Sequence, residues 1–595
     1  MRRTRIPVLL LASTLALGLA ACGDDAKDCL PGTSPDAAPV TTPDAALALP
    51  DADIVPPDAA PLPPVEVQVL AFNDFHGNLE APAGSSGTVV TERPMTGPPV
   101  TVPAGGAAFF ADHIAALRAT NPNTIVVSAG DLIGASPLLS ALFHDEPTIE
   151  AMNLIGLDIA AVGNHEFDEG GPELLRMQYG GCHPQDGCAD GTGFPGASFE
   201  YLAANVVVDA GTGKTLFPRY AIREFEGVPV AFIGMTLEAT PTIVTPLGVG
   251  GLEFQDEVAT VNALIPELEV QGVHAIVVLV HEGGFQTGLY DQCVDASGAI
   301  VDIATQLSPA VDLIISGHTH AAYNCEIAGK RVTSALSFGR LITKIDLELD
   351  RSTREIISLA AENLIVTREG QGASAITSLL SHYLAIAAPL RDRVVGSTTG
   401  ILGAPRPAPG GTMTPAGEST LGDVIADSQL YATSSPSLGG ARIAFMNPGG
   451  VRADIDAGEV SFGEIFTVQP FGNSLVVMTL TGAQLHTLLE QQFTATTTRV
   501  LQPSAGFTYA WSTAAPIGAK VDPARMKLDG VVIDPTTSYR VTVNSFLATG
   551  GDGFRVLVDG QSRVGGLVDL QALEEYFHAQ SPVAPPAQDR ITLVP

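Results

Sequence analysis

Positive charge is scarce in this chain, which has 30 lysines and arginines against 64 aspartates and glutamates among 595 residues and a formal net charge of −34 at pH 7. A protein this acidic repels anionic polymers, which excludes a basic scaffold that binds nucleic acid. We therefore expect no nucleic-acid polymer among its partners. A site for a small anionic molecule would need its own local positive charge, from metal ions or from individual arginines.

Long apolar runs are also lacking beyond the amino terminus, since no later segment reaches the 18 or so uninterrupted apolar residues that a membrane span requires. Hydrophobic residues nevertheless make up 45% of the chain and charged residues 16%, with 62 glycines and 44 prolines. This composition excludes a largely disordered or collagen-like chain. The sequence predicts an acidic globular protein.

The amino terminus has the pattern of a targeting segment. Three arginines at positions 2, 3 and 5 precede an apolar stretch, Ile6 to Leu19, which ends at the small-residue cleavage site Leu19-Ala20-Ala21. With the next residue, Cys22, the segment Leu-Ala-Ala-Cys resembles a bacterial lipobox, which implies a lipoprotein signal peptide over residues 1–21 and lipid on Cys22. The alternative is an ordinary secretory signal followed by a chance cysteine. We expect an exported protein that is lipid-anchored at the cell envelope, on the periplasmic face or the cell surface.

Residues 22–64 have a composition that cannot pack a core. From Gly23 to Pro64, 10 of 42 residues are proline, 9 are alanine and 8 are aspartate, and none is aromatic. Repeated Pro-Asp-Ala favours extended, self-repelling conformations, so this segment is expected to be a stalk between the anchor and the folded protein. A disordered tail without a spacing role is the alternative.

Cysteine is rare, with six residues in the whole chain. No two of them have the Cys-x-x-Cys spacing of a thiolate metal site, so disulfides are favoured in an exported protein. Cys182 and Cys188 would close a Gly-rich loop. Cys293 and Cys325 would join two loops beyond apolar runs, which leaves Cys29 free.

The strongest signal is a series of apolar, strand-like runs that are each followed by residues able to bind metal. These pairings are Val65–Phe72 before Asp74 and His76, Thr124–Ser128 before Asp131, Asp158–Val162 before Asn164, Ala275–Val280 before His281, and Val311–Ile315 before His318 and His320. A single Asp or His after a strand is usually a cap or a turn residue. Five such runs in order instead predict one shared site.

Helical stretches alternate with these runs, among them Ala107–Thr120 and Val258–Gln271. Short runs rich in valine and isoleucine that alternate with helices predict an α/β domain with largely buried strands. In such sheets ligands bind beyond the carboxyl ends of the strands. The metal-binding residues are therefore expected to meet at that edge.

The seven side chains after the strands supply two carboxylates, four imidazoles and one amide oxygen. A tetrahedral zinc needs only four protein ligands, so seven suit two divalent ions that share Asp131 as a bridging carboxylate. Mixed nitrogen and oxygen ligands favour Zn, Mn, Fe, Co or Ni over Mg or Ca. Two such ions would supply the missing positive charge, polarise a phosphoryl group and lower the pKa of a bridging water to give hydroxide. This chemistry predicts hydrolysis without a covalent enzyme intermediate.

His165 and Asp168 stand beside the predicted ligand Asn164 and are three positions apart, so in a helical turn they would face the same side. A carboxylate in that place orients the imidazole and favours its protonated form. His165 could then stabilise charge in the transition state or protonate the leaving oxygen. The alternative is that His165 is a further metal ligand or a packed turn residue.

Taken together, Asn-Asp-x-His, Gly-Asp, Gly-Asn-His-Glu-x-Asp, a single His after a strand and Gly-His-x-His resemble the motifs of calcineurin-type metallophosphoesterases. Their order, with a long second domain, resembles the 5'-nucleotidase and UDP-sugar hydrolase family over about residues 65–595. The resemblance implies a four-layer α/β/β/α metal domain at residues 65–365 and a separate α/β nucleotide-binding domain at residues 396–595. It also implies that His165 and Asp168 form a catalytic dyad, and that Gln can replace His320 in some relatives. The ligand sets it implies are Asp74, His76, Asp131 and His320 for one ion, and Asp131, Asn164, His281 and His318 for the other.

Between the two domains, residues 366–395 are expected to form a linker that acts as a hinge. Ala373–Ala387 has apolar residues at helical spacing and predicts a helix there.

The second domain contains glycine-rich turns with phenylalanines beside or near them, within the segments Asn447–Arg452, Gln469–Asn473 and Asn544–Phe554. Glycine permits a tight backbone near a ligand, and a phenylalanine beside it can stack on a flat ring. Taken alone, such a phenylalanine is more often a core residue that caps a turn. The family resemblance implies a nucleotide pocket instead. The roles it implies are a base sandwich by Phe471 and Phe546, ribose binding by Asp552, base or phosphate contacts by Asn447 and Arg452, and assistance by Asn473.

One position departs from the family pattern. Relatives commonly have an arginine before the Glu-Ser-Thr-Leu-Gly segment at residues 418–422, where this chain has Gly417. Phosphate binding by a second arginine is therefore not expected at that position.

These patterns predict an extracytoplasmic phosphohydrolase that cleaves nucleoside 5'-monophosphates to nucleoside and phosphate. A UDP-sugar hydrolase or a 2',3'-cyclic nucleotide phosphodiesterase/3'-nucleotidase would keep the metal ligands and differ in the pocket. The sequence is also compatible with a sulfur-compound hydrolase on the same scaffold and with a non-catalytic surface binding lipoprotein.

Overall fold

The structure is a computed structural model that describes residues 62–594, apart from residues 83, 96, 243, 245–247, 406–412 and 495–496. The predicted signal peptide, the lipidation site Cys22, Cys29 and nearly all of the predicted stalk lie outside the described residues. Within the described residues, no helix combines the length and the apolar character needed to cross a membrane.

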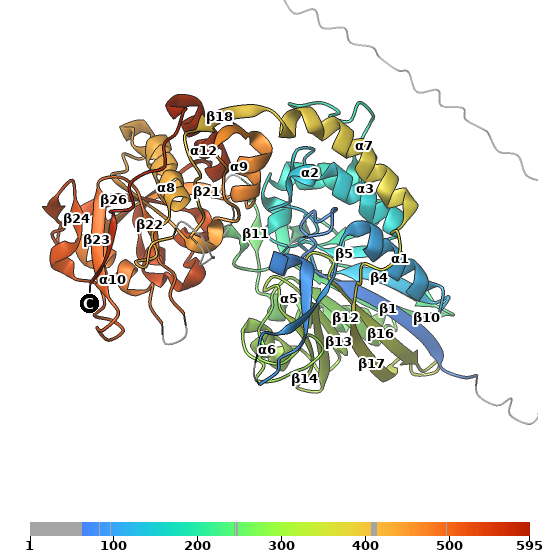
Figure 1. Cartoon of the computed structure of the whole chain (residues 1–595). Helices are drawn as coiled ribbons and strands as arrows, with labels where there is room; N and C mark the ends of the chain where they lie inside the picture. Colours follow the sequence, from blue (N-terminus) through green and yellow to red (C-terminus); the bar gives the residue numbers. More distant parts are fainter. Residues whose placement is uncertain are drawn as a thin grey trace, which may run out of the picture. The chain divides into compact units, whose positions relative to one another are not determined.

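Two six-stranded sheets form the centre of the first part of the chain (Figure 1). The strands of the first sheet, in spatial order, are β17 (Ile356–Ile365), β16 (Leu341–Leu349), β1 (Val65–Phe72), β4 (Thr124–Ser128), β5 (Ile159–Ala161) and β6 (Glu200–Leu202). Those of the second sheet are β14 (Ala322–Ile327), β15 (Lys330–Ala335), β13 (Leu313–Ser316), β12 (Ala275–Val280), β10 (Val228–Met235) and β9 (Tyr220–Phe225). Each sheet contains four neighbouring strands that are parallel. They are β1, β4, β5 and β6 in the first sheet and β10, β12, β13 and β15 in the second. Their carboxyl ends therefore lie at a common edge.

Strand β1 shows why both faces of the first sheet are buried. Val67 and Val69 point into a core that the second sheet also lines, for example with Val277 of β12. Leu70 and Phe72 point to the opposite face, into a core lined by helices. Because side chains alternate along a strand, a stretch buried on both sides is apolar throughout, as Val69–Phe72 is, whereas the start of β1 still contains the exposed Glu66.

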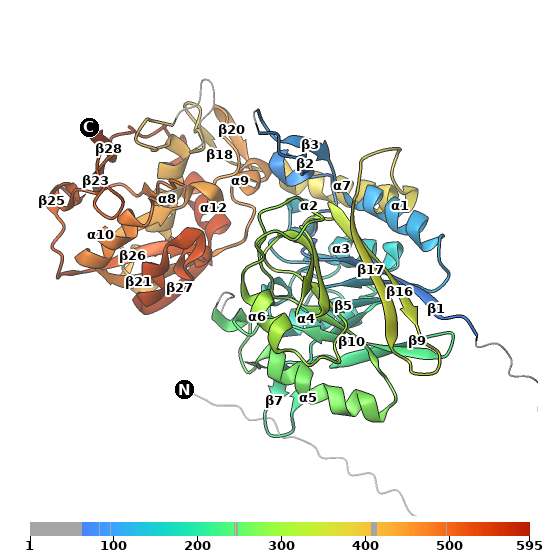
Figure 2. The ribbon, with the colours of Figure 1, turned by 90° about the horizontal axis from the view of Figure 1, so that it is seen from below.

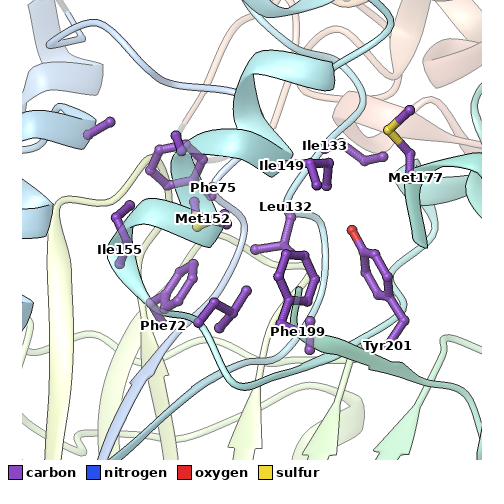
Figure 3. Close-up of a cluster of buried hydrophobic side chains, with 14 of the residues drawn as sticks. Phe72, Phe75, Leu132, Ile133, Ile149, Met152, Ile155, Met177, Phe199 and Tyr201 are labelled. Atoms are coloured by element: carbon purple, nitrogen blue, oxygen red, sulfur yellow. The ribbon is translucent and has the colours of Figure 1, made fainter. Parts of the chain in front are cut away.

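Helices cover the outer face of each sheet. The helices α1 (Ala107–Arg118), α3 (Glu146–Ile155) and α7 (Ser374–Arg391) pack on the first sheet, and α5 (Glu257–Val270) and α6 (Ala299–Gln306) on the second. Figure 3 shows part of the first of these cores, where Phe72 of β1 gathers with Met152 and Ile155 of α3. This arrangement confirms the predicted four-layer α/β/β/α domain.

The helix expected in the linker forms as α7, but it is packed along its length. Tyr383 is fully buried, its ring lies 4.8 Å from that of Phe143, and its hydroxyl donates to Glu150 at 3.2 Å. The helix therefore belongs to the outer layer of the first domain. A hinge within residues 366–395 stays a prediction, and it fits best after Arg391, where α7 ends.

The second part of the chain has its own α/β core. Its main sheet is formed by β22 (Gln502–Pro503), β19 (Ile443–Met446), β26 (Ser538–Asn544), β21 (Ser474–Thr481) and β27 (Gln561–Val568). Helices α8 (Thr420–Thr433) and α12 (Asp569–Gln580) lie side by side in both views (Figures 1 and 2), and α10 (Gly482–Glu490) packs into a core with β21 and β26. The separate α/β unit expected from the sequence is confirmed.

The structure joins Cys182 to Cys188 and Cys293 to Cys325, as predicted. The second disulfide connects the loop after β12 to strand β14.

Candidate metal centre

The seven predicted ligands meet at the carboxyl ends of five strands. Those from the first sheet follow β1, β4 and β5, and those from the second follow β12 and β13. The parallel register of each sheet brings these ends to one edge. The prediction that these side chains converge is therefore confirmed by the geometry, while their role as metal ligands is a proposal.

Three donor atoms form a first cluster. The Nε2 atoms of His76 and His320 lie 3.0 Å apart, and Oδ1 of Asp74 lies 3.9 Å from His76 and 3.5 Å from His320. Asp74 and His76 are buried, whereas the His320 side chain is 38% exposed. The cluster is thus open to solvent on the side of His320.

A second cluster forms around Asn164. Its Oδ1 lies 3.1 Å from Nε2 of His281 and 3.0 Å from Nδ1 of His318. Asn164 and His281 are buried, and His318 is partly exposed. Each ring directs a nitrogen towards the same amide oxygen, as side chains that share an ion would.

Asp131 connects the two clusters. Its Oδ2 lies 3.0 Å from Nε2 of His281 and 3.5 Å from Nε2 of His76. One carboxylate oxygen therefore faces a histidine from each cluster, the position expected of a bridging ligand.

The tautomers of two histidines suit a metal. Nδ1 of His76 lies 2.9 Å from the carbonyl of Gly134, and Nδ1 of His281 lies 2.8 Å from that of Ala129. Since a carbonyl oxygen only accepts, each Nδ1 carries a proton, and it is Nε2 that faces the centre, where a neutral ring would offer its lone pair to an ion. A hydrogen bond from the second ring nitrogen of a metal-binding histidine fixes the orientation of the ring and strengthens metal binding.

The electrostatics of the buried carboxylates also call for cations. Burial, together with the nearby charge of Asp131, raises the pKa of Asp74 to about 7. Two ionised carboxylates in this dry environment are stable only if positive charge compensates them. The mixed oxygen and nitrogen donors fit Zn, Mn, Fe, Co or Ni, so the residues present fit a pair of divalent ions.

Five of the seven side chains stand on left-handed backbone. Their φ angles are 51° for Asp74, 48° for His76, 51° for Asp131, 68° for His318 and 52° for His320. Such residues cost on the order of 1–3 kcal/mol each and cluster at functional sites, where the surrounding structure holds them. The sharp turns let the chain leave each strand while its side chain reaches the centre.

Glu166 is a positioning residue to which the sequence analysis gave no role. Its fully buried carboxylate accepts hydrogen bonds from the backbone N–H groups of Asp131, Leu132 and Gly163, at 3.0, 2.8 and 2.7 Å. It thereby fastens the turn that carries Asp131 to the turn that carries Asn164. Its place inside the Gly-Asn-His-Glu-x-Asp motif was the available signal.

Asn73 holds the other carboxylate that is predicted to bind metal. Its side-chain amide donates to Oδ2 of Asp74 at 2.5 Å and to the carbonyl of Leu336 at 2.6 Å, and its Oδ1 accepts from the backbone N–H of Ala335 at 2.7 Å. The turn after β1 is thus attached to the segment that follows β15.

The predicted dyad forms beside the metal centre. Nδ1 of His165 lies 2.8 Å from Oδ2 of Asp168, and the backbone N–H of His165 donates to Oδ1 of Asp131 at 2.9 Å. Although burial disfavours the charged ring, Asp168 and Asp131 raise the pKa of His165 to about 10. The ring centroid lies 5.1 Å from that of His76, and among the described residues neither donor cluster includes His165. This geometry favours an acid over a further ligand.

Four of the predicted substrate residues lie in two pairs in the second domain. The side-chain amide of Asn447 donates to Oδ2 of Asp552 at 2.9 Å, and its Oδ1 accepts from Asn544 at 3.0 Å. The guanidinium carbon of Arg452 lies 5.7 Å from the ring centroid of Phe471, within cation–π range.

The two phenylalanines predicted to hold a base are both available for stacking. Phe471 is 37% exposed and Phe546 is 44% exposed. Asn473 has a local structural role, since its Oδ1 accepts from Ser545 at 3.1 Å and its carbonyl accepts from the backbone N–H of Asp569 at 2.7 Å.

Arg499 is a candidate that the sequence analysis missed, because no motif surrounds it. Its Nε lies 3.4 Å from Oδ1 of Asp552. Gly417, where relatives have arginine, has a φ of +91°, and a Cβ there would lie 2.6 Å from Cγ2 of Val500. Val500, which follows Arg499 in the sequence, therefore packs against the position where relatives have arginine.

Comparisons with known proteins agree with this geometry. Residues 67–322 match the calcineurin-like phosphoesterase domain, and residues 394–559 match the 5'-nucleotidase C-terminal domain. The fold and the donor clusters thus define a metallophosphoesterase. Within that class, the chain belongs to the 5'-nucleotidase family, which confirms the resemblance found in the sequence.

The chain is 34% identical over 542 residues to Endonuclease YhcR of Bacillus subtilis (strain 168), an alignment that covers 89% of this chain and 41% of that protein. It is 31% identical over 517 residues to Cell wall protein Lmo0130 of Listeria monocytogenes, covering 82% of this chain and 64% of the relative. It therefore spans less than two thirds of the length of either protein. The solved 5'-nucleotidase precursor of Thermus thermophilus has a TM-score of 0.59 at 27% identity, covering 89% of this chain and 99% of that one. Together these matches support the prediction of a metal-dependent phosphoester hydrolase.

Proposed function

We propose that this protein is an extracytoplasmic phosphohydrolase that cleaves nucleoside 5'-monophosphates to nucleoside and phosphate with the help of two divalent metal ions. The observation that carries the proposal is the position of Asp131, whose Oδ2 faces His281 at 3.0 Å and His76 at 3.5 Å. This arrangement suits two ions on one carboxylate. The bound ions would bring positive charge to the phosphoryl group and lower the pKa of the attacking water.

His165 would act as the acid. Asp168 accepts from Nδ1, which leaves the opposite ring nitrogen, Nε2, to hold a proton for the leaving oxygen of the nucleoside. The raised pKa of His165 means that this proton is present at neutral pH. A leaving group protonated in this way departs as an alcohol.

Asn447, Asp552, Phe471 and Phe546 would bind the nucleoside. The carboxylate of Asp552 suits ribose hydroxyls, and the exposed faces of the two phenylalanines suit a base. Arg452 and Arg499 are the nearby cations that could contact phosphate. The predicted metal ligands and these residues lie in different domains, so the reaction requires the domains to meet. The end of the predicted linker, after α7 ends at Arg391, would supply the hinge.

Export and attachment are part of the same proposal. The signal-like segment at residues 1–21 and lipid on Cys22 would place the enzyme at the cell envelope, where nucleotides from outside the cytoplasm are available. A Cys22→Ser substitution should then release the protein from the membrane fraction.

The decisive experiment is phosphate release by metal-stripped protein to which Zn, Mn, Co or Mg is added back. The substrates are AMP, UDP-glucose, 2',3'-cyclic AMP, a single-stranded oligonucleotide and p-nitrophenyl phosphate, which has no base. We expect AMP to be hydrolysed with the highest kcat/KM. Equal turnover of AMP and p-nitrophenyl phosphate would contradict the nucleotide pocket, and preference for a diester would support the broader phosphodiesterase. No activity with any cation would overturn the enzymatic proposal.

A further inference from the structure

A second group of metal-binding side chains lies outside the centre described above and has no part in the proposed reaction. It consists of His144, Glu169, Glu173 and His183, each of which offers one ligand atom, and all four atoms lie within 4.8 Å of one another. Two imidazoles and two carboxylates are a donor set that zinc and similar ions bind in proteins.

Four separate pieces of local structure bring these residues together. His144 follows helix α2 (Leu138–Ala141), Glu169 directly follows the dyad residue Asp168, and Glu173 lies in helix α4 (Gly171–Tyr179). His183 lies in the loop that the disulfide between Cys182 and Cys188 closes. Its backbone N–H and carbonyl both bond to Gly187, at 3.1 and 2.9 Å. The loop is therefore held in a definite conformation.

The donor atoms are already close to one another. Nδ1 of His144 lies 2.7 Å from Oε2 of Glu169. The ring of His144 stacks on that of His183 with centroids 3.7 Å apart, so a ring must rotate before both can direct a nitrogen at one ion. A tetrahedral zinc with bonds of roughly 2.0–2.2 Å would place ligand atoms roughly 3.3–3.6 Å apart. Closing the cluster around an ion therefore requires movements of about 1 Å, which side-chain rotations can supply.

The local charges favour a cation. Arg176 is bound to Glu173 at 2.6 Å and to Glu146, so its charge is shared between two carboxylates. Glu169 and Asp186 are compensated by His144, which lies 2.7 and 2.9 Å from them. A divalent ion would bring two charges where a proton on His144 brings one.

The burial of the cluster also suits an ion that enters from solvent. The side chains of His144, His183 and Glu173 are 19%, 13% and 12% exposed, while that of Glu169 is 45% exposed. Three ligands are thus largely shielded, and the fourth provides an open side.

We propose that His144, His183, Glu169 and Glu173 form a third divalent-metal site, for an ion such as Zn²⁺, that is distinct from the dinuclear centre. The proposal does not depend on the substrate of the enzyme. Its position suggests a consequence for the dyad, because Glu169 is bonded to Asp168 in sequence and both line one pocket with His165. An ion on Glu169 would hold the turn that presents the acid.

The number of ions per chain tests this proposal directly. Full-length protein is stripped with a chelator, dialysed against Zn²⁺ and measured by plasma mass spectrometry together with a protein assay. We expect three zinc ions per chain in the wild type, two in the double variant His144→Gln/His183→Gln, and one in Asp131→Asn. The last variant separates this site from the dinuclear centre without any measurement of activity.

His578→Gln is the matched control, since His578 is an exposed histidine that lies 3.2 Å from Glu574 outside any donor cluster of the described residues. It should keep three ions. Glu169→Gln changes an exposed side chain and keeps the test decisive if the double variant fails to fold. It should lower the affinity for the third ion at least tenfold and leave the affinity for the other two unchanged. A wild type with two ions, or a double variant with three, would overturn the proposal.

Discussion

Nε2 of His281 lies 3.0 Å from Oδ2 of Asp131, although the two residues follow strands of different sheets. The same oxygen lies 3.5 Å from Nε2 of His76. Among the side-chain contacts of the described residues, no other predicted ligand has a donor atom of both clusters within 3.5 Å, since Asp74 reaches His318 only through the backbone N–H. The proposed dinuclear centre therefore depends on Asp131 more than on any other side chain.

Asp131→Asn is expected to remove both ions of the dinuclear centre, because the amide keeps the shape but loses the charge that two cations share. Activity should fall by more than about 100-fold, which is a larger loss than the removal of a hydrogen-bond partner of a metal ligand causes. Metal content and kcat/KM for AMP are the measurements. His320→Gln is the comparison, since His320 is 38% exposed and glutamine keeps a donor oxygen. It should retain both ions, and equal losses in the two variants would contradict a bridging role for Asp131.

Glu166→Gln should disturb the centre without touching a ligand. The amide replaces one acceptor oxygen with a donor that would face a backbone N–H, so we expect a loss of about 1–3 kcal/mol in the free energy of unfolding. Affinity for the ions should fall by about 10–100-fold. Denaturant unfolding with and without metal measures both effects. Unchanged metal affinity in a folded variant would mean that the two turns hold their positions without this carboxylate.

His165→Gln distinguishes an acid from a ligand. An acid contributes about 10²–10⁴-fold to the rate, so kcat should fall by that factor while two ions remain in the dinuclear centre. Asp168→Asn should show a smaller loss, since it keeps a group that can bond to the ring but removes its charge. A further readout is the leaving group, because p-nitrophenolate needs no proton and its release should be affected less. Loss of an ion in His165→Gln would support the alternative role as a ligand.

Phe546→Ala and Arg499→Ala test the nucleotide pocket. Removing a stacking ring should raise KM for AMP by about 10-fold or more, in line with about 1–3 kcal/mol for a stacked base. Arg499→Ala should also raise KM for AMP, because Arg499 lies 3.4 Å from Asp552, the residue predicted to bind the ribose. Val531→Ala, at a side chain that is 71% exposed, is the control. Hydrolysis of p-nitrophenyl phosphate should stay near the wild-type rate in Phe546→Ala and Val531→Ala, and a parallel loss on both substrates in Phe546→Ala would argue against base recognition. A loss on both substrates in Arg499→Ala would indicate that this arginine contacts the phosphate.

Asp569 should make stability depend on pH. Burial raises its pKa to about 7 from an ordinary value of 3.8, even though the backbone N–H of Leu570 donates to it at 2.8 Å. Well below pH 3.8 the Asp569 carboxyl is protonated in both states, and its contribution to the free energy of unfolding is largest. As the pH rises from about 4 to about 7, the unfolded state ionises while the folded state keeps its proton, so the free energy of unfolding falls; above about pH 7 both states are ionised and the fall ends. Each pKa unit corresponds to about 1.4 kcal/mol, so the loss amounts to a few kcal/mol at most.

The neutral variant Asp569→Asn isolates this effect. Its free energy of unfolding between pH 4.5 and 7.5 should fall by less than that of the wild type in denaturant titrations. Identical slopes for the two proteins would show that Asp569 ionises in the folded state near its ordinary pKa.

Much of the metal centre could be predicted from the sequence, because strand ends and ligands are neighbours along the chain. Asp74 and Asp131 follow apolar runs, and parallel strands bring such positions to one edge. Glu166 and Asn73 could not be assigned in the same way. Their partners are backbone groups of other turns, and a backbone N–H has no signature in a sequence.

In the second domain, less of the candidate site could be predicted from the sequence. Its glycine-rich turns identified Asn447 and Asp552, which lie 2.9 Å apart, but Arg499 was missed because it approaches Asp552 from 53 positions earlier in the chain. The proposed third metal site was also missed, since no motif surrounds His144 or His183 and only folding places them in contact.

The sequence by itself determined the class of the protein, its strands and the candidate metal-binding residues that follow them, because these depend on residue type and on spacing within short segments. Only the tertiary structure decided which oxygen faces both clusters, where the dyad stands beside them, and that four further side chains form another donor set. The reason is that a donor set depends on distances of a few ångströms between segments that the chain itself separates by tens of residues.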